Sequence, residues 1–478
     1  MSAALKIAGE EWRYWLRSNL ALAVIGLFAI ILVSVSLLPA LRMSAENAAR
    51  ELHQAEAEQT FLSQPDRHPH RMVHYGHYVF RAPVPLALFD PGLDSVTGQS
   101  MFLEGHRQNS ATFSTSVASA NLGSFSWLTP ALVYQLLAPL LIILLGHGAI
   151  IREREAGALI PLLAQGVNGR TLILGKVLAL LAFILLLLLP LIISALLSVA
   201  QGESLLAVMS LVGVYFLYLL VWAGLALLVS SSLNKRSSVV ATLASFWLVL
   251  TLVLPAVAVN NSSNALPIAG KIESELAMLT ENHELSDGHN VPDAAFDQLR
   301  TNLLIEYGVD RVEDLDVNIR GIVAQTAEET LTDSMNLYAE NRMSQELQQA
   351  NIVTNHGWIT PVISIATASR AISGTDLEHY HSFLRQAEIV RYDFVQGLNK
   401  VHAEQLSYVV DINRSRDQES ERQTRMDASN WQVLNEFRFE ASNASERLSN
   451  ASTSIIMLAV WVLGLCGLLA WVGGRLKP

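Results

Sequence analysis

Long uncharged apolar runs alternate with polar segments along the 478-residue chain. Each run has about 20 residues or more, the length that a helix needs to cross a hydrocarbon core of about 30 Å. The third run contains Pro190 and is expected to bend there. The pattern predicts six transmembrane helices, at residues 19–38, 130–151, 172–198, 205–229, 239–259 and 454–472.

A short amphipathic segment, residues 1–18, precedes the first run. Trp12 and Trp15 share one helical face, and Arg13 and Arg17 lie on another. This pattern is typical of a helix that lies in the membrane interface, anchored by tryptophans at headgroup depth. An ordinary soluble first helix is the alternative interpretation.

Two large polar insertions interrupt the apolar pattern, at residues 39–129 and 260–453, whereas the 152–171 loop and the 473–478 tail are short. The second insertion has amphipathic helical periodicity, so the predicted fold is an all-α polytopic membrane protein whose second insertion is mainly helical. Its helices are expected at 294–307, 319–350 and 377–414, with breaks at Asp287-Gly288, Trp358–Pro361 and Gly374-Thr375.

Composition and charge support a membrane protein and suggest its orientation. Hydrophobic residues make up 51% of the chain and charged residues only 16%, and the single cysteine, Cys466, excludes an intrachain disulfide. Basic residues gather in the N-terminal segment, the short loops and the tail, while the 260–453 insertion has twice as many acidic as basic residues. The positive-inside rule therefore predicts cytoplasmic termini and extracytoplasmic insertions.

The apolar runs lack the chemistry of an ion-coupled transporter or an intramembrane hydrolase. Their ionisable residues are essentially His147, near the end of the second run, and Lys176, near the start of the third. His147 is interpreted as a packed or interfacial side chain. The chain also has no Gly-x-x-x-x-Gly-Lys-Ser/Thr phosphate loop. We therefore expect no enzymatic activity in this chain, and any energy source must be a separate subunit.

The loop between the second and third runs is the candidate site for coupling to that subunit. It combines alternating charges, a glycine, an apolar cluster and a basic start to the next run. Such a short amphipathic helix can dock in a groove of a cytoplasmic partner. The alternative is an ordinary basic loop that only fixes topology. The candidate coupling residues are Arg152, Glu153, Arg154, Glu155, Gly157, Leu159, Arg170 and Lys176.

This loop resembles the coupling region of ABC type-2 exporter permeases, in its Arg-Glu-Arg-Glu-x-Gly-x-Leu segment, its Pro-Leu-Leu, and its Gly-Lys at the next span. The resemblance implies a transmembrane subunit of a bacterial inner-membrane exporter. It also implies an ATP-binding partner subunit, which would hold ATP and Mg, and a second permease copy or paralogue. No cofactor is expected in this chain and no nucleic acid among its partners.

A subgroup resemblance and a histidine-rich stretch concern the first insertion. His74–Tyr78, Asp90-Pro91-Gly92 and Phe102–Asn109 resemble multicopper-enzyme-maturation permeases, which have two extracytoplasmic insertions. The weak metal candidates are His68, His70, His74 and His77, with His106 further on. Their spacing matches no established site, so a loop packed with aromatic residues is the favoured interpretation and no metal is predicted.

Two other functions remain open. The acidic helical insertion is suited to act as a sensor or docking platform through which an ATPase drives an extracytoplasmic protein without passage of cargo. A receptor that has no ATPase is the third possibility. The sequence does not identify a cargo.

Overall fold

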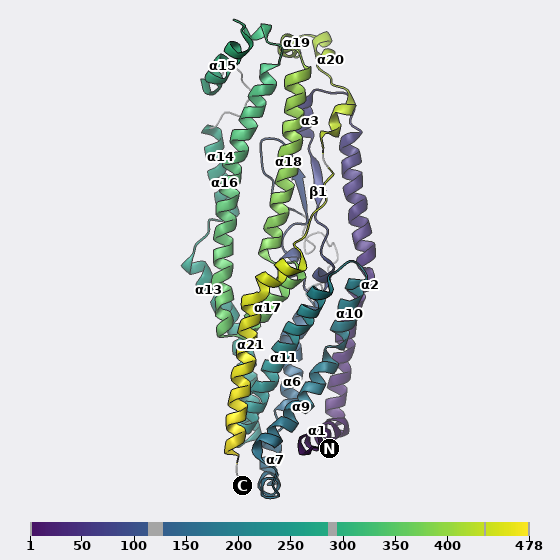
Figure 1. Cartoon of the computed structure of the whole chain (residues 1–478), viewed down its shortest axis with the longest axis vertical. Coiled ribbons are helices and arrows are strands. Elements are labelled where there is room, and N and C mark those ends of the chain that lie inside the picture. The colour runs from purple at the N-terminus through teal and green to yellow at the C-terminus, as the bar shows by residue number, and fades with distance from the viewer. Residues whose placement is uncertain (1, 113–127, 285–293, 435, 477–478) are drawn as a thin grey trace.

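The computed structural model describes residues 2–112, 128–284, 294–434 and 436–476. These residues are mostly helical and form an elongated molecule with an apolar bundle and a distal helical body (Figure 1). Helix α1, which follows the N-terminus, and the end of α21 both lie at the base of the bundle. The expected break at Asp287-Gly288 falls outside the described residues.

The bundle collects the apolar runs. Five of its helices are long and apolar enough to cross a membrane, and α1 with the first part of α2 forms a sixth candidate, bent by 87°. The protein is therefore compatible with a polytopic membrane protein. The bundle elements are α1 (Ala3–Arg17), α2 (Asn19–Leu62), α5 (Pro130–Leu132), the π-helical turn Val133–Leu137, α6 (Ala138–Gly146), α7 (Ile151–Glu155), α8 (Leu159–Ala164), α9 (Gly169–Leu187), α10 (Leu189–Val199), α11 (Leu205–Ser232), α12 (Arg236–Leu248), the π-helical turn Val249–Val253, α13 (Leu254–Ala265) and α21 (Ala444–Arg475).

Several of these helices extend beyond the predicted apolar runs. The first does not end near residue 38 but continues as α2 to Leu62, so the first insertion starts as helix and not as loop. Its polar second half is held by the distal body, because Gln54 accepts a 2.9 Å hydrogen bond from the Phe80 amide and Phe61 is buried. The third run breaks before Pro190, as expected, into α9 and α10.

Two π-helical turns interrupt neighbouring bundle helices, and side chains satisfy the carbonyls that they displace. The Trp247 indole donates a 2.9 Å hydrogen bond to the Leu136 carbonyl. The Thr360 hydroxyl donates a 2.7 Å bond to the Leu250 carbonyl. An apolar environment requires every backbone group to find a partner, so these polar side chains compensate for the irregular turns.

The distal body consists mainly of α16 and α18, which run side by side in Figure 1. The three expected amphipathic helices are present as α15, α16 and α18, but the third ends at Gln405 and not at residue 414. The helical elements are α3 (Pro69–Tyr75), α14 (Lys271–Glu284), α15 (Asp297–Tyr307), α16 (Ile319–Asn355), α17 (Pro361–Ser373), α18 (Leu377–Gln405), α19 (Tyr408–Asn413), α20 (Gln418–Gln423) and the short 3-10 turns Pro85–Leu88, Gly92–Ser95, Ala294–Phe296, Val312–Asp314, His356–Trp358 and Ala428–Val433.

The two insertions form one body, and that body is not purely helical. Strands β1 (His77–Phe80) and β2 (Ser100–Leu103) pair antiparallel, with His77 opposite Leu103. Val79 and Leu103 pack on Phe394 and Trp431, which come from the second insertion. The all-α prediction is therefore wrong for this small sheet. Its strands are too short to give a clear sequence pattern, and residues far away in the chain stabilise them.

One helix of the second insertion returns to the bundle. Helix α17 packs against α11 and α21, and Ile365 and Ile372 are part of the bundle core. It lies between the expected breaks, since Pro361 starts it and Gly374 ends it with a φ of 64°. The 260–453 insertion is thus anchored in the bundle at its middle as well as at its ends.

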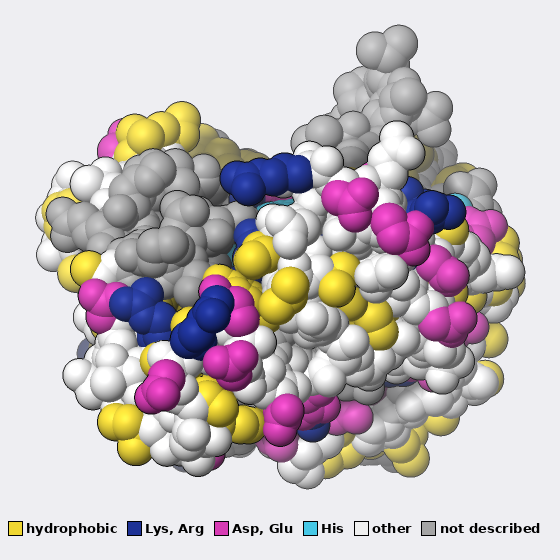
Figure 2. Space-filling view, turned by 90° about the horizontal axis from the view of Figure 1, so that it is seen from above, with side chains coloured by type: hydrophobic (Ala, Val, Ile, Leu, Met, Phe, Trp, Pro, Cys, Tyr) yellow, Lys and Arg dark blue, Asp and Glu magenta, His cyan; other side chains and the backbone are white. Residues whose placement is uncertain are grey.

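Figure 2 shows the end face of the distal body. Acidic and basic side chains are interspersed over this face, with apolar side chains between them. The face therefore has the mixed charge of a solvated surface rather than a patch of one sign.

Candidate functional site

The candidate coupling segment lies at the base of the bundle, away from the distal body (Figure 1). It folds as two short helices, α7 and α8, joined by a tight turn in which Gly157 has a φ of 67°. This left-handed conformation is costly for other residues, which explains the glycine. Asn168 then caps α9 through a 2.7 Å bond from the Thr171 amide.

Four charged side chains converge behind this segment. The Lys176 ammonium bonds the carboxylates of Glu11 and Glu153, and Glu11 also bonds the Arg152 guanidinium. The side chains of Glu11 and Lys176 are almost fully buried. Arg152 also lies 3.8 Å from the centroid of the Tyr14 ring. The network therefore joins α1, α7 and α9, three segments that are distant in sequence.

The remaining charges of α7 fasten it to the turn before α12. Arg154 donates hydrogen bonds to the carbonyls of Leu233 and Ser231, the latter at 2.8 Å. Glu155 accepts a 2.7 Å bond from the Arg236 amide. The same Arg236 donates from its Nε to His147 at 3.0 Å, so His147 is a packed residue, as expected. These charges hold the segment in place within the chain.

The outer side of α8 is the part left exposed. Leu159 and Leu163 pack inward on Ile150 and Leu172, whereas Ile160 is 62% exposed next to Pro161. The side chain of Arg170 is exposed as well, beside the backbone of Gly474 in α21. The structure therefore places the inner charges of this segment in contacts within the bundle and leaves an apolar tip at the surface.

The expected interfacial anchors divide between two faces of α1. Trp15 is buried, and both Trp12 and Trp15 pack on Phe183, with ring centroids 6.4 and 6.1 Å away. Arg13 and Arg17 are exposed. The tryptophans thus fix α1 to α9 instead of projecting from the bundle, because burial against a neighbouring helix gives their large rings more contact.

The histidines of the first insertion separate into three environments. His70 and His74 approach His106. His68 instead bonds Asp411 at 3.1 Å, as does His402 at 2.9 Å. His77 lies apart between Phe61 and Phe394. The four predicted candidates therefore do not form one site.

Burial and hydrogen bonding set the ionisation of these groups. Burial lowers the pKa of His77 to about 4. Burial opposes ionisation of Asp411 as well, but hydrogen bonds from His402 and His68 outweigh it and hold the Asp411 pKa below its usual range. Asn318 also donates to Asp411, so this buried carboxylate organises a structural hydrogen-bond network.

A second buried ion network was missed by the sequence analysis. Arg391 bonds Glu328, and it bonds Glu388 at 2.7 Å and the Thr332 hydroxyl at 2.8 Å. Glu328 also lies 2.9 Å from the His106 Nδ1. Burial opposes ionisation of Glu328, but the His106 hydrogen bond and the Arg391 charge outweigh it and lower the Glu328 pKa. The sequence contains no signal for this pairing, because the charged residues of α16 and α18 follow no distinctive spacing.

A buried polar chain connects the distal body with the bundle. The Ser369 hydroxyl bonds Asp90 at 2.5 Å and the Tyr215 hydroxyl at 3.0 Å. Gln135 donates to the same tyrosine at 2.9 Å. Burial raises the pKa of Asp90 despite the nearby Arg370 charge. The chain links the first insertion, α17 and α11 in one hydrogen-bonded unit.

Comparison with known proteins gives one partial match. Residues 272–440 match a family model described as a domain of unknown function (DUF3526). The matched region is about a third of the chain and corresponds to the distal body from α14 to the segment before α21. No curated protein matches the chain. The match therefore marks the second insertion as a recurring unit but assigns it no activity.

Proposed function

We propose that the chain is the transmembrane subunit of an ATP-driven exporter of the ABC type-2 class, driven by a separate ATP-binding subunit. The α7–α8 segment is the docking element, at the base of a bacterial inner-membrane bundle, with both termini on the same cytoplasmic side. The distal body then lies outside the cytoplasm. Arg152, Glu153 and Lys176 brace the segment, and the exposed tip makes the contact.

The observation that carries this proposal is the contrast within the docking segment. Its charges are bonded inward to Glu11, Ser231 and Arg236, whereas Ile160 at its outer end is largely exposed. A segment that transmits force must be fixed firmly to the bundle and must present a surface to its partner. An exposed apolar side chain on a braced support fits a protein–protein contact.

Two exposed apolar helices support a second permease copy. In the most apolar stretches of Arg236–Ala265 and Ala444–Arg475, only 17% and 22% of the residues are buried, compared with 50% to 72% in the other three long helices. In a Cys466→Ser background, Leu252→Cys should form a disulfide-linked dimer and the equally exposed Leu185→Cys should not. A dimer from neither position would contradict this interface.

The docking proposal is tested with the full-length chain purified from the membranes of its source organism. We expect vanadate-sensitive ATP hydrolysis to co-purify with it, and Ile160→Asp to reduce that hydrolysis by roughly tenfold or more, as for an interface hot spot. The matched control is Ile305→Asp, since Ile305 is 74% exposed but lies in the distal body. Equal hydrolysis in the two variants would refute docking through α8.

The proposed orientation has its own test. In the Cys466→Ser background, Gln165→Cys and Ser429→Cys place single thiols at exposed positions of the docking segment and the distal body. A membrane-impermeant maleimide should label only the Ser429→Cys variant in spheroplasts. Labelling of Gln165→Cys alone would invert the topology and remove the docking segment from the cytoplasm.

Mechanical signalling without cargo is the second candidate, and the continuity of α2 favours it. This helix has 44 residues and thus spans about 66 Å, from the base of the bundle into the distal body. Movement at the base can reach the distal body through α2 and through the Asp90–Ser369–Tyr215 chain.

Reconstitution of the chain with its ATPase separates the two candidates. Export predicts ATP-dependent loss of a lipid or solute from one leaflet or compartment of the vesicle. Mechanical signalling predicts an ATP-dependent change in distal-body accessibility, read from a fluorophore on Ser429→Cys, with no cargo movement. A receptor without an ATPase predicts neither.

A further inference from the structure

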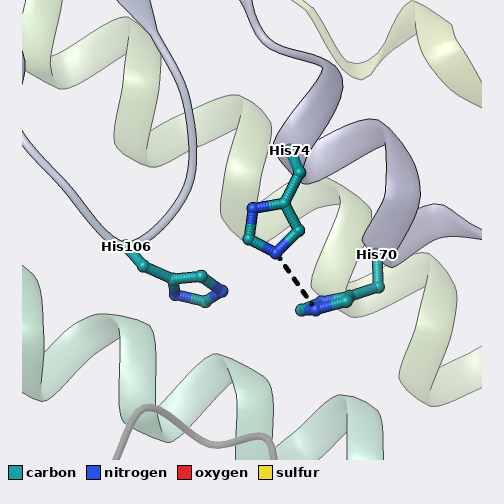
Figure 3. A group of neighbouring side chains, drawn as sticks. All are labelled: His70, His74 and His106. Carbon is teal, nitrogen blue, oxygen red and sulfur yellow. Dashed lines mark hydrogen bonds between the residues drawn. The ribbon is translucent and has the colours of Figure 1, made fainter.

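Three imidazoles from two separate segments meet on the distal body. His70 and His74 come from α3, and His106 comes from the loop after β2. One ring nitrogen of each lies within 4.8 Å of those of the other two. Figure 3 shows the three rings turned toward a common space, with Nε2 of His70 and Nε2 of His74 3.3 Å apart.

This nitrogen spacing matches a tetrahedral metal ion. Two imidazole nitrogens bound to Zn²⁺ at about 2.0–2.1 Å with tetrahedral angles lie roughly 3.3 Å from each other. His70 and His74 are four residues apart on α3, so both side chains lie on one face of the helix. The His106 nitrogen is farther off, and a shift of about 1.5 Å or less brings it to the same spacing.

The loop that presents His106 is fixed against α3. Its neighbour Gly105 donates a 3.1 Å hydrogen bond to the Val73 carbonyl, and a Cβ at residue 105 would collide with the Val73 side chain. His106 itself has a φ of 66°, and it is the one non-glycine residue with positive φ in the described part of the chain. Such strained backbone persists where the surrounding structure holds it and often marks a functional site.

A buried carboxylate orients the His106 ring. Glu328 accepts the His106 backbone amide at 3.2 Å and lies 2.9 Å from its Nδ1. Nε2 is then the nitrogen that points toward His70 and His74 in Figure 3. Metal-bound histidines typically donate their other ring nitrogen to a carboxylate in this way, which fixes the tautomer and the orientation. Arg391 holds Glu328 from the opposite side.

The other histidine cluster in the described residues lacks this design. The Asp411 carboxylate bonds Nε2 of His68 and Nε2 of His402, and it also accepts a hydrogen bond from Asn318. His68 uses its Nδ1 to accept the His70 amide at 3.1 Å, as the N-cap of α3. Both nitrogens of His68 therefore have structural partners, and the cluster is buried. It supports α3 rather than competing for an ion.

We propose that His70, His74 and His106 form a binding site for Zn²⁺. Three neutral imidazoles without a cysteine form a set that suits this ion. The site lies in the first insertion, and it stands whether or not the chain is an exporter.

The test uses the full-length protein in detergent, without a polyhistidine tag and stripped with a chelator. Zn²⁺ is titrated against a chromophoric chelator, and bound metal is counted by elemental analysis. We expect one tightly bound Zn²⁺ per chain. His70→Ala, His74→Ala and His106→Gln should each weaken binding by more than the roughly 10–100-fold loss expected for Glu328→Gln.

The matched control is His53→Ala, because His53 is also exposed and paired with a glutamate, but on α2. It should leave Zn²⁺ binding unchanged. Bound Co²⁺ should give the intense visible absorption of a tetrahedral ion and lose it in His74→Ala, whose exposed side chain can be removed without disturbing the core.

Three results would overturn the proposal. The first is binding that remains in the His70→Ala/His74→Ala/His106→Gln triple variant. The second is weak octahedral Co²⁺ absorption in the wild type, and the third is loss of the ion in His68→Gln but not in His74→Ala. Size-exclusion profiles and thermal midpoints without metal verify that each variant is folded.

Discussion

Two buried ion networks, one at the base of the bundle and one in the distal body, support different kinds of surface. At the base, Lys176 pairs with Glu11 and Glu153 behind the exposed apolar side of α8. In the distal body, Arg391 neutralises Glu328 behind a polar histidine cluster. The first network ties three helices of the bundle together, whereas the second lies between two helices and a surface loop.

Each buried network fixes the segment that it supports in one position. Replacing one member of such a network leaves another buried charge with fewer partners, which costs free energy of folding. Each network therefore holds its segment rigidly. At the base, the rigid unit is the helix pair α7–α8. In the distal body, it is a single side chain, His106, held in one orientation. Substitutions in the two networks should therefore have different effects.

The largest effect is expected from Lys176→Met. This change removes the buried cation that Glu11 and Glu153 share, so that Glu11 keeps only Arg152 and the half-buried Glu153 loses its cation. Removing one partner of a buried ion pair typically costs roughly 3–5 kcal/mol. We expect loss of most monodisperse protein in fluorescence-detected size-exclusion chromatography and a lower thermal midpoint. The control is Lys235→Met, since Lys235 is an exposed cation in the neighbouring turn. Equal behaviour of the two variants would show that the base network does not brace the bundle.

A similar but more local loss is expected from Arg391→Met. It leaves Glu328 and Glu388 without their cation, at a cost of about 3 kcal/mol, but the bundle helices do not depend on this pair. Adding Glu328→Gln should recover part of the stability because the buried charge is then removed. Hydrogen exchange should increase in α16 and α18 and not in α9 or α11.

Arg385→Met is the comparison for that experiment. Arg385 pairs with Glu340 at the surface of the same helices, where such a pair contributes about 1 kcal/mol or less. If both arginine variants alter hydrogen exchange equally, the buried distal network stabilises the body no more than a surface ion pair does.

The segment at the base of the bundle could be predicted from the sequence because its residues are neighbours in the chain. Arg152, Glu153 and Gly157 stand together between two apolar runs, and this contrast alone predicts a surface segment. Their partners were not predictable in the same way. The sequence pattern assigned no role to Glu11, and only tertiary packing brings it to Lys176.

The distal body shows the opposite case. The amphipathic periodicity predicted α15, α16 and α18, since a helical repeat is local. The sheet, the return of α17 to the bundle and the His106–Glu328 pair all depend on contacts between residues far apart in the chain. The sequence therefore showed only that several histidines lie close together in the chain. Which of them come into contact depends on the fold.

The pH dependence of the distal body follows from His77. Its folded-state pKa is about 4, whereas the unfolded chain has a value near 6.5. The unfolded state thus binds a proton first as the pH falls, so the free energy of unfolding is highest above pH 6.5. It should decrease toward pH 4 by up to roughly 3 kcal/mol.

Thermal midpoints between pH 7.5 and 4 measure this loss. His77→Leu should reduce the dependence because it removes the titrating ring from between Phe61 and Phe394. His53→Leu should not, since His53 is exposed. His68, whose pKa burial also lowers to about 4, supplies the acid sensitivity that remains in the first variant. An unchanged slope in His77→Leu would assign the sensitivity elsewhere.

The smallest effect concerns Gly157 and separates two reasons for a glycine in the turn between α7 and α8. Its φ of 67° accounts for it by backbone conformation, and nothing lies within 4 Å of the position of a Cβ. Gly157→Ala should therefore lower the free energy of unfolding by about 1 kcal/mol. Gly157→Asn should cost less, because asparagine tolerates this conformation. Gly148→Ala, which meets equally open space without a positive φ, is the control.

The order of the two Gly157 variants changes if the glycine permits close approach of the ATP-binding subunit. Thermal stability should then still rank asparagine above alanine, but co-purifying ATP hydrolysis should rank them by size, with alanine above asparagine. If hydrolysis follows stability instead, Gly157 serves only the turn. The contact would then be confined to the exposed side of α8, around Ile160, and the base network would have the single task of holding that side in place.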